Sequence, residues 1–130
     1  MNNLVFMRPP TEYQECVVFW KWVKLNNSIR DLTFHIPNEA KRSIGAACAL
    51  KNTGLVPGVP DYFIALPRGL FGGLFIEMKR NSKKLSKIST DQKLWIEKLL
   101  KNGYQACVCY GAMEAIKCVQ NYLQSRNIVV

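Results

Sequence analysis

Three residues, Asp61, Glu77 and Lys79, are of the types that can act on a phosphate group: two carboxylates and an ammonium. Glu77 and Lys79 stand two positions apart in an apolar run that predicts a strand over residues 73–79, and alternate strand residues face the same way. Asp61 opens a second predicted strand, residues 61–66, and the turn between the two strands predicts an antiparallel hairpin. We therefore expect Asp61 to lie near Glu77 or Lys79.

Two neighbouring carboxylates raise the pKa of one of them unless a cation neutralises the pair. Hard divalent cations such as Mg²⁺ and Mn²⁺ prefer oxygen ligands, so this pair is a candidate metal site. A lysine beside the ion can orient water or stabilise charge that develops on a phosphate. The alternative interpretation is a solvent-exposed strand face, on which an ion pair between Glu77 and Lys79 contributes less than about 1 kcal/mol.

The rest of the chain supplies the elements that must position these residues. Apolar periodicity and helix-end signals predict four helices and two further strands. The helices are expected over 11–26, 39–52, 89–103 and 112–124, and the strands over 32–36 and 104–111. With the hairpin included, the elements alternate in an order that predicts an α/β fold, a mixed sheet flanked by helices.

The predicted helix ends carry recognisable signals. Thr11 is the expected N-cap of the first helix, and Gly54 follows the second. The third helix begins with an S-x-x-Q capping box, Ser89 and Gln92, and ends at Gly103. Its expected apolar stripe consists of Leu94, Trp95, Leu99 and Leu100.

The chain has 130 residues, 18 of them basic and 9 acidic, and a net charge of +9. This length predicts a single domain over residues 1–130. The charge favours a polyanionic partner, nucleic acid first and an anionic membrane second. No apolar run approaches the roughly 20 residues of a membrane span, and no signal peptide is recognisable, so we expect a cytoplasmic location.

The cysteines and tryptophans predict core positions. The five cysteines are an odd number without a C-x-x-C motif, which favours small buried apolar residues over zinc ligands or disulfide partners. The tryptophans, at helical spacing, are expected in the core rather than as base-stacking platforms; they are Trp20, Trp22 and Trp95.

The segment "PGVPDYFIALPRGLFGGLFIEMKR" resembles the PD-(D/E)xK nuclease motif and, more specifically, the VRR-NUC family of virus-type replication and repair nucleases. The other matching segments are "TEYQE", "FHIPNEAKRS" and "STDQKLWIEKLLKNGYQACVCYG", which follow in the family's order and cover nearly the whole chain. The resemblance implies a restriction-endonuclease-like fold and a DNA nuclease.

The resemblance also implies roles for single residues. Asp61 and Glu77 would be metal ligands, the main-chain carbonyl of Met78 would complete the metal shell, and Lys79 would be the catalytic lysine. Gln92 matches a family glutamine, and it has a second interpretation as half of the capping box.

An upstream glutamate belongs to the same implied site. Glu12 matches the family's metal-binding glutamate on the first helix, and Glu15, one turn along the same face, remains the alternative. The family often has a glutamine four residues after that glutamate, where this chain has Cys16.

Basic and polar residues around the site are expected to contact DNA phosphates. The loop "KRNSKKLSK" follows the predicted site strand directly, and His35, the single histidine, has an alternative interpretation as a packed or surface residue. The expected DNA-binding residues are His35, Asn38, Lys41, Arg42, Arg80, Lys83, Lys84 and Lys87.

The site residues together with the resemblance predict a DNA endonuclease dependent on Mg²⁺ or Mn²⁺. The resemblance further implies selectivity for branched DNA, like that of a Holliday-junction resolvase. The resemblance implies a homodimer and a bacterial or phage-infected cell as its setting. Two other functions remain open: a DNA-binding module without catalysis, and a sequence-specific restriction-type endonuclease.

Overall fold

The computed structural model describes residues 8–37 and 43–125. Its elements follow in the predicted order, with one addition, a 3₁₀ helix before the first strand. In chain order they are α1 (Glu12–Lys24), η1 (Arg30–Leu32), β1 (Thr33–His35), α2 (Ile44–Asn52), β2 (Tyr62–Ile64), β3 (Leu74–Lys79), α3 (Thr90–Lys101), β4 (Gln105–Tyr110) and α4 (Ala112–Leu123).

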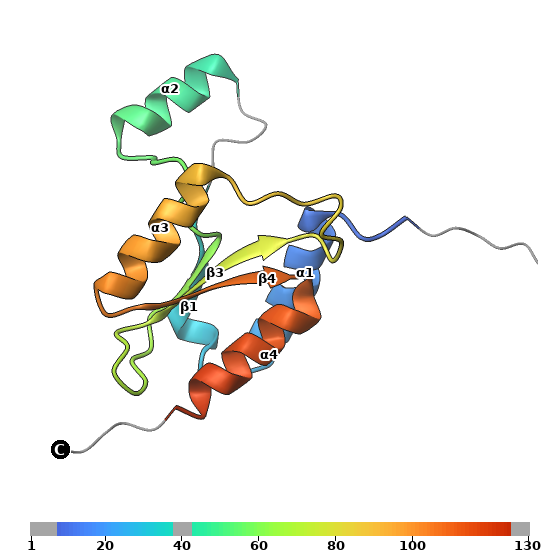
Figure 1. Cartoon of the computed structure of the whole chain (residues 1–130), viewed down its shortest axis with the longest axis vertical. Helices are drawn as coiled ribbons and strands as arrows, with labels where there is room; N and C mark the ends of the chain where they lie inside the picture. Colours follow the sequence, from blue (N-terminus) through green and yellow to red (C-terminus); the bar gives the residue numbers. More distant parts are fainter. Residues whose placement is uncertain (1–7, 38–42, 126–130) are drawn as a thin grey trace, which may run out of the picture.

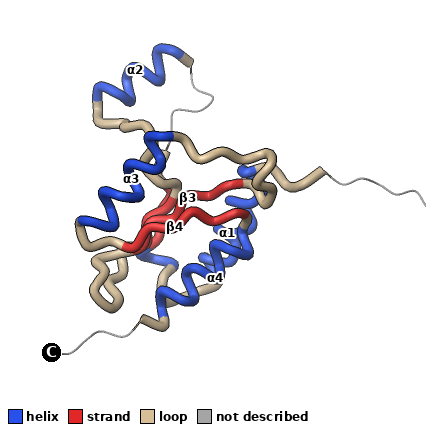
Figure 2. Tube along the Cα trace, viewed as in Figure 1, coloured by secondary structure: helices blue, strands red, loops and turns tan. Residues whose placement is uncertain are grey.

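The four strands form one open sheet in the order β1-β2-β3-β4. β1 and β3 each pair antiparallel with β2, whereas β4 pairs parallel with β3. The predicted hairpin is confirmed, and its register sets Tyr62 opposite Ile76. Because parallel neighbours need a crossover connection, α3 links β3 to β4 (Figure 2). The fold is the predicted mixed α/β sheet.

Helices cover the sheet on two sides (Figure 1). α1 and α4 pack against each other and against β3, and α4 also contacts β4. α3 packs against β4 from the other side. The α1–α4 side holds the main apolar core, in which Ile76 and Met78 of β3 are fully buried. Burial of such side chains contributes roughly 1.5–3 kcal/mol each.

Aromatic rings occupy the opposite side of the sheet. Phe63 stacks on Phe75 with ring centroids 4.3 Å apart, and Tyr104 meets both rings edge-on. Strand alternation sets Glu77 and Lys79 on the same side as Phe75. The candidate site therefore faces α3 rather than the α1–α4 core.

Capping boxes begin both α1 and α3. Thr11 accepts a hydrogen bond from the Gln14 amide and donates its own amide to the Gln14 side chain, a pairing that sequence analysis had not identified. Ser89 and Gln92 form the predicted box at α3.

The buried face of α3 differs from the predicted stripe. Leu99 is buried, but Leu94 and Leu100 are 45% and 46% exposed. The inward positions are 92, 95, 96 and 99, the i, i+3, i+4, i+7 spacing of one helix face. Leu94 and Leu100 lie beside that face, because the helix has more apolar residues than its sheet contact covers.

Helix α2 differs most from expectation. It begins after the N-cap Ser43, and the residues before it in the predicted range, 39–42, lie outside the described residues. None of its side chains is buried, and the helix stands apart from the sheet (Figure 1). Cys48 is therefore exposed, contrary to the expectation for the cysteines, whereas Cys109 is buried as expected. All five cysteines are free.

No helix within the described ranges has the length and apolar character required to cross a membrane.

Candidate active site

The β2–β3 hairpin brings Asp61 to β3 as predicted. Asp61 lies one residue before β2, and its Oδ2 accepts a hydrogen bond of 2.7 Å from the Met78 amide. The register that pairs Tyr62 with Ile76 also sets Asp61 level with Glu77. The aspartate side chain thus continues the pairing of the two strands past the end of β2, and its orientation is fixed by the backbone.

Glu77 and Lys79 form an ion pair inside the protein. The Lys79 Nζ lies 3.6 Å from Glu77 Oε1. The two residues are only 2% and 7% exposed, and Asp61 is 5% exposed. The interpretation of a solvent-exposed strand face is therefore wrong. Burying charged groups costs free energy unless they are paired. The desolvation cost of this buried pair must therefore be offset by further interactions, whereas an exposed pair has no such cost.

Burial and repulsion raise the pKa values of the acidic groups. The pKa of Glu77 is raised to about 8, first by burial and then by the Asp61 carboxylate, although Lys79 lowers it. Burial also raises the pKa of Asp61, against the lowering effect of the hydrogen bond from Met78. For Glu12, burial raises the pKa first and Asp61 raises it further. The cluster therefore holds more carboxylate charge than its surroundings stabilise.

Gln92 takes part in the predicted capping box and also contacts the candidate site. Its Oε1 accepts from the Ser89 amide in the capping box, while its Nε2 donates to Glu77 Oε1 at 2.8 Å. The first turn of α3 is thereby tied to the candidate site.

Glu12 and Glu15, which the sequence left as alternatives, lie in different surroundings. Glu12 is half-buried, and the Asp61 and Lys79 charges both act on its pKa. Glu15 is buried and accepts a hydrogen bond from the amide of Ala112, the first residue of α4. Glu15 is thus engaged in capping another helix, and Glu12 is the glutamate near Asp61.

The cap that Glu15 provides was missed by sequence analysis. Gly111 is the N-cap residue of α4 and has no side chain to accept the first amides of that helix. The glycine just before the predicted helix indicates only that no local side chain caps it, and it does not identify the partner. Glu15 lies 97 residues earlier in the chain.

The oxygen donors suit Mg²⁺ or Mn²⁺ in type but do not form a closed cage. Over residues 8–37 and 43–125, no three His, Cys, Asp or Glu side chains are grouped so as to hold a metal ion by themselves. Mg²⁺ characteristically binds one or two carboxylates and keeps water or substrate phosphate in its other positions. Asp61 and Glu77, buried together with raised pKa values, fit such an open site. Asp61 Oδ2 and Glu77 Oε1 already accept hydrogen bonds within the protein, so an ion would draw on the other oxygen of each carboxylate.

The basic loop 80–88 runs beside the start of α1. The Arg80 side chain donates to the carbonyls of Pro9 and Pro10 at 3.0 and 3.2 Å, so it anchors the chain ahead of α1. The Lys83 ammonium lies 5.3 Å from the centre of the Tyr110 ring. These two predicted DNA contacts therefore have structural partners within the protein.

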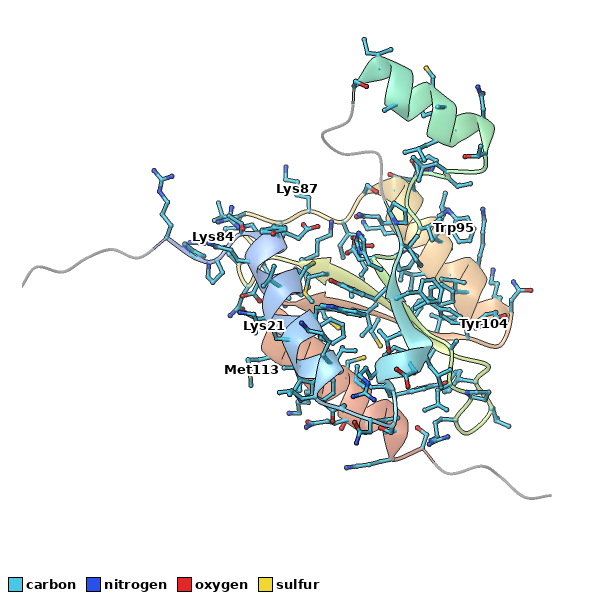
Figure 3. All side chains as sticks on the ribbon, turned by 180° about the vertical axis from the view of Figure 1, so that it is seen from behind. Lys21, Lys84, Lys87, Trp95, Tyr104 and Met113 are labelled. Carbon is cyan, nitrogen blue, oxygen red and sulfur yellow. The ribbon has the colours of Figure 1, made fainter. Side chains whose placement is uncertain are left out.

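Other predicted DNA contacts are more open. Lys84 and Lys87 are exposed, and Figure 3 shows them along the loop near the N-terminal end of α1. His35 is exposed on β1, with its ring centre 5.3 Å from that of Tyr62. The remaining three predictions, Asn38, Lys41 and Arg42, lie outside the described residues.

Comparisons with known proteins agree with this geometry. The model of the VRR-NUC domain matches residues 3–113. A solved structure of a VRR_NUC domain protein is similar with a TM-score of 0.80 and 30% sequence identity, over 93% of this chain and 94% of that one. A search of curated proteins found no match. The chain therefore belongs to the VRR-NUC family, and it is a nuclease-type, DNA-processing domain.

Proposed function

We propose that this domain is a DNA endonuclease that hydrolyses phosphodiester bonds at the Asp61–Glu77–Lys79 site with Mg²⁺ or Mn²⁺. The observation that carries the proposal is the burial of two carboxylates and one ammonium at the end of the hairpin, with the pKa of Glu77 raised to about 8. Strongly perturbed acids are concentrated at functional sites.

The residues of the site have distinct roles in this proposal. Asp61 and Glu77 would hold the ion, with Glu12 beside them and the Met78 carbonyl as a further ligand. When bound, the ion activates the scissile phosphate and lowers the pKa of a water molecule. Lys79, held by Glu77, orients the attacking water or stabilises charge on the phosphate.

The test is cleavage of labelled DNA in Mg²⁺, in Mn²⁺ and in EDTA. Wild-type protein is expected to cut only with metal, and Lys79→Ala and Asp61→Asn are expected to lose roughly 100-fold or more of the rate. Lys98→Ala, an exposed lysine on α3 that contacts the Trp95 ring, is the matched control. Cleavage by Lys79→Ala at the wild-type rate would disprove the assignment.

We also propose that the substrate is branched DNA, including four-way junctions, and that two copies act as a homodimer. The net charge of +9 on a single small domain supports a large polyanionic substrate.

The DNA panel should therefore contain a single strand, a duplex, a flap, a splayed arm and a four-way junction. Cutting at one defined sequence in long duplex DNA would instead indicate a restriction-type enzyme. Binding without cleavage in either metal would indicate a DNA-binding module.

A further inference from the structure

A cavity of about 630 Å³ opens beside the candidate active site. This volume is within the roughly 300–1,000 Å³ typical of ligand pockets. Its β-strand side consists of His35, Asp61 and Tyr62. Its helical side is one stripe of α1, made by Glu12, Tyr13, Cys16, Val17, Trp20, Lys21 and Lys24. We call this cavity the α1 groove. At about 1.5 Å per residue, the stripe from its first to its last residue is about 18 Å long.

Charge changes sign along the α1 groove. Glu12 and Asp61 mark the end that the groove shares with the candidate active site. Lys21 and Lys24, both exposed, lie in the last turn of α1 at the other end. Figure 3 shows Lys21 on the outer side of α1. A polyanionic chain that passes the active site therefore meets two ammonium groups further along the groove.

Aromatic rings lie between these charged ends. Trp20, which was expected in the core, is only half-buried at its edge and stacks on Tyr62, with ring centroids 6.5 Å apart and an interplanar angle of 16°. Tyr62 is buried, so it supports Trp20 from below. Tyr13, next to Glu12, is 76% exposed. Aromatic faces beside basic residues are the combination that binds single-stranded nucleic acid, because every base has a face that can stack.

We propose that the α1 groove binds unpaired nucleotides of the DNA strand adjoining the scissile phosphate. Bases would stack on Tyr13 and Trp20, and backbone phosphates would contact Lys21 and Lys24. Duplex bases already stack on one another, so their faces are closed to protein rings. The inference rests on the proposed nuclease function, and among the branched substrates it favours those with a single-stranded segment beside the cut, such as a flap or a splayed arm, over the fully paired four-way junction.

The first test measures binding by fluorescence anisotropy in EDTA, where no metal-dependent cleavage occurs. A labelled single strand and a blunt duplex of the same sequence are the probes. Tyr13→Ala and Trp20→Leu are each expected to weaken single-strand binding at least about fivefold, with little effect on the duplex. Met113→Ala, which removes a 75% exposed side chain from α4, is the control and should change neither.

A second test addresses the lysines through salt dependence. For a single strand, the slope of log affinity against log salt decreases by about 0.7 for each phosphate that the protein no longer neutralises. The double variant Lys21→Ala/Lys24→Ala is therefore expected to bind single-stranded DNA with a weaker salt dependence than the wild type, that is, with a slope of smaller magnitude. The control is Lys98→Ala/Lys101→Ala, the same spacing in the last turn of α3, and its slope should match that of the wild type.

Single-strand binding left unchanged by Tyr13→Ala and by the Lys21/Lys24 variant would overturn the proposal. Both variants alter exposed side chains, so this conclusion does not depend on whether Trp20→Leu folds. The assays also separate the two levels of inference. If these variants lose single-strand binding while the wild type cuts no DNA with metal, the proposed nuclease function is rejected, but the proposed single-strand binding by the α1 groove is supported.

Discussion

The raised pKa of the Glu77 carboxyl group should make the stability of the folded protein depend on pH. This pKa rises from an ordinary 4.5 to about 8 on folding, so the folded protein disfavours the ionised form. Well below pH 4.5 this carboxyl group is protonated in both the folded and the unfolded protein, so it does not contribute to the pH dependence of stability. As pH rises from 4.5 towards 8, the unfolded chain releases its proton more readily than the folded one. The metal-free protein is therefore expected to lose stability across that range.

Urea unfolding in EDTA at a series of pH values checks this prediction. Glu77→Gln cannot ionise, so it should show a smaller loss of stability between pH 4.5 and 8 than the wild type. Glu97→Gln, an exposed carboxylate on α3, should retain the wild-type pH dependence. If the Glu77 and Glu97 variants behave alike, the raised pKa of Glu77 is refuted.

The acidic pair was predictable because it depends on local rules. Strand alternation and a short hairpin bring Asp61 and Glu77 together within one continuous stretch of chain. The same reasoning did not predict that Glu77 and Lys79 are buried, since burial depends on α3 and the neighbouring strands. Glu15 was beyond sequence analysis for the same reason: its partner is an amide 97 residues away.

Helix ends illustrate the same division between local and distant information. The capping boxes that begin at Thr11 and Ser89 each lie within four consecutive residues, and both N-cap residues were predicted correctly. The buried face of α3 was only partly predicted, because periodicity does not say how much of an apolar helix its neighbours cover. Helix α2 shows the extreme case: it is apolar in sequence yet has no buried side chain.

The junction of β4 and α4 provides a test of the distant cap. Gly111 has φ +96°, and a Cβ there would lie 2.5 Å from Glu15 Oε2. Gly103, after α3, has a similar φ of +88° but open space around it. Gly→Ala is strained at both positions because φ is positive. The strain is larger at Gly111, whose ψ of 163° places it in a backbone region essentially restricted to glycine, at a cost of about 1–3 kcal/mol. Only Gly111→Ala also displaces Glu15 and leaves the Ala112 amide unpaired, which costs about 1–3 kcal/mol more.

The free energies of unfolding in urea, measured for the two alanine variants, should therefore differ. We expect Gly111→Ala to be the less stable by at least about 1 kcal/mol, from the lost cap and the more strained backbone together. Equal stability of the two variants would show that Glu15 does not contribute to the cap of α4.

The molecule as a whole carries a large positive charge, and this bears on the proposed homodimer. Each copy has a net charge of +9, so pairing brings two strongly like-charged domains together. Salt screens such repulsion, with a Debye length of about 8 Å at physiological ionic strength. The dimer is therefore expected to become more populated as salt rises, whereas DNA binding weakens.

Light scattering coupled to size exclusion, at low and at moderate salt, measures this directly. A mass near twice the chain mass of 14.8 kDa is expected, with the larger dimer fraction at higher salt. A mass of one chain under every condition would remove the homodimer from the proposal.

The hydrogen bond from Met78 to Asp61 has a consequence for how this fold could lose its chemistry over time. A descendant that no longer cuts DNA can replace Lys79 together with its ion-pair partner Glu77, since losing this pair leaves no backbone group unsatisfied. It cannot replace Asp61 so freely, because the buried amide of residue 78 still requires an acceptor. Proteins of this fold that have lost nuclease activity should therefore keep an oxygen-bearing side chain at the position of Asp61 even where the lysine has been replaced.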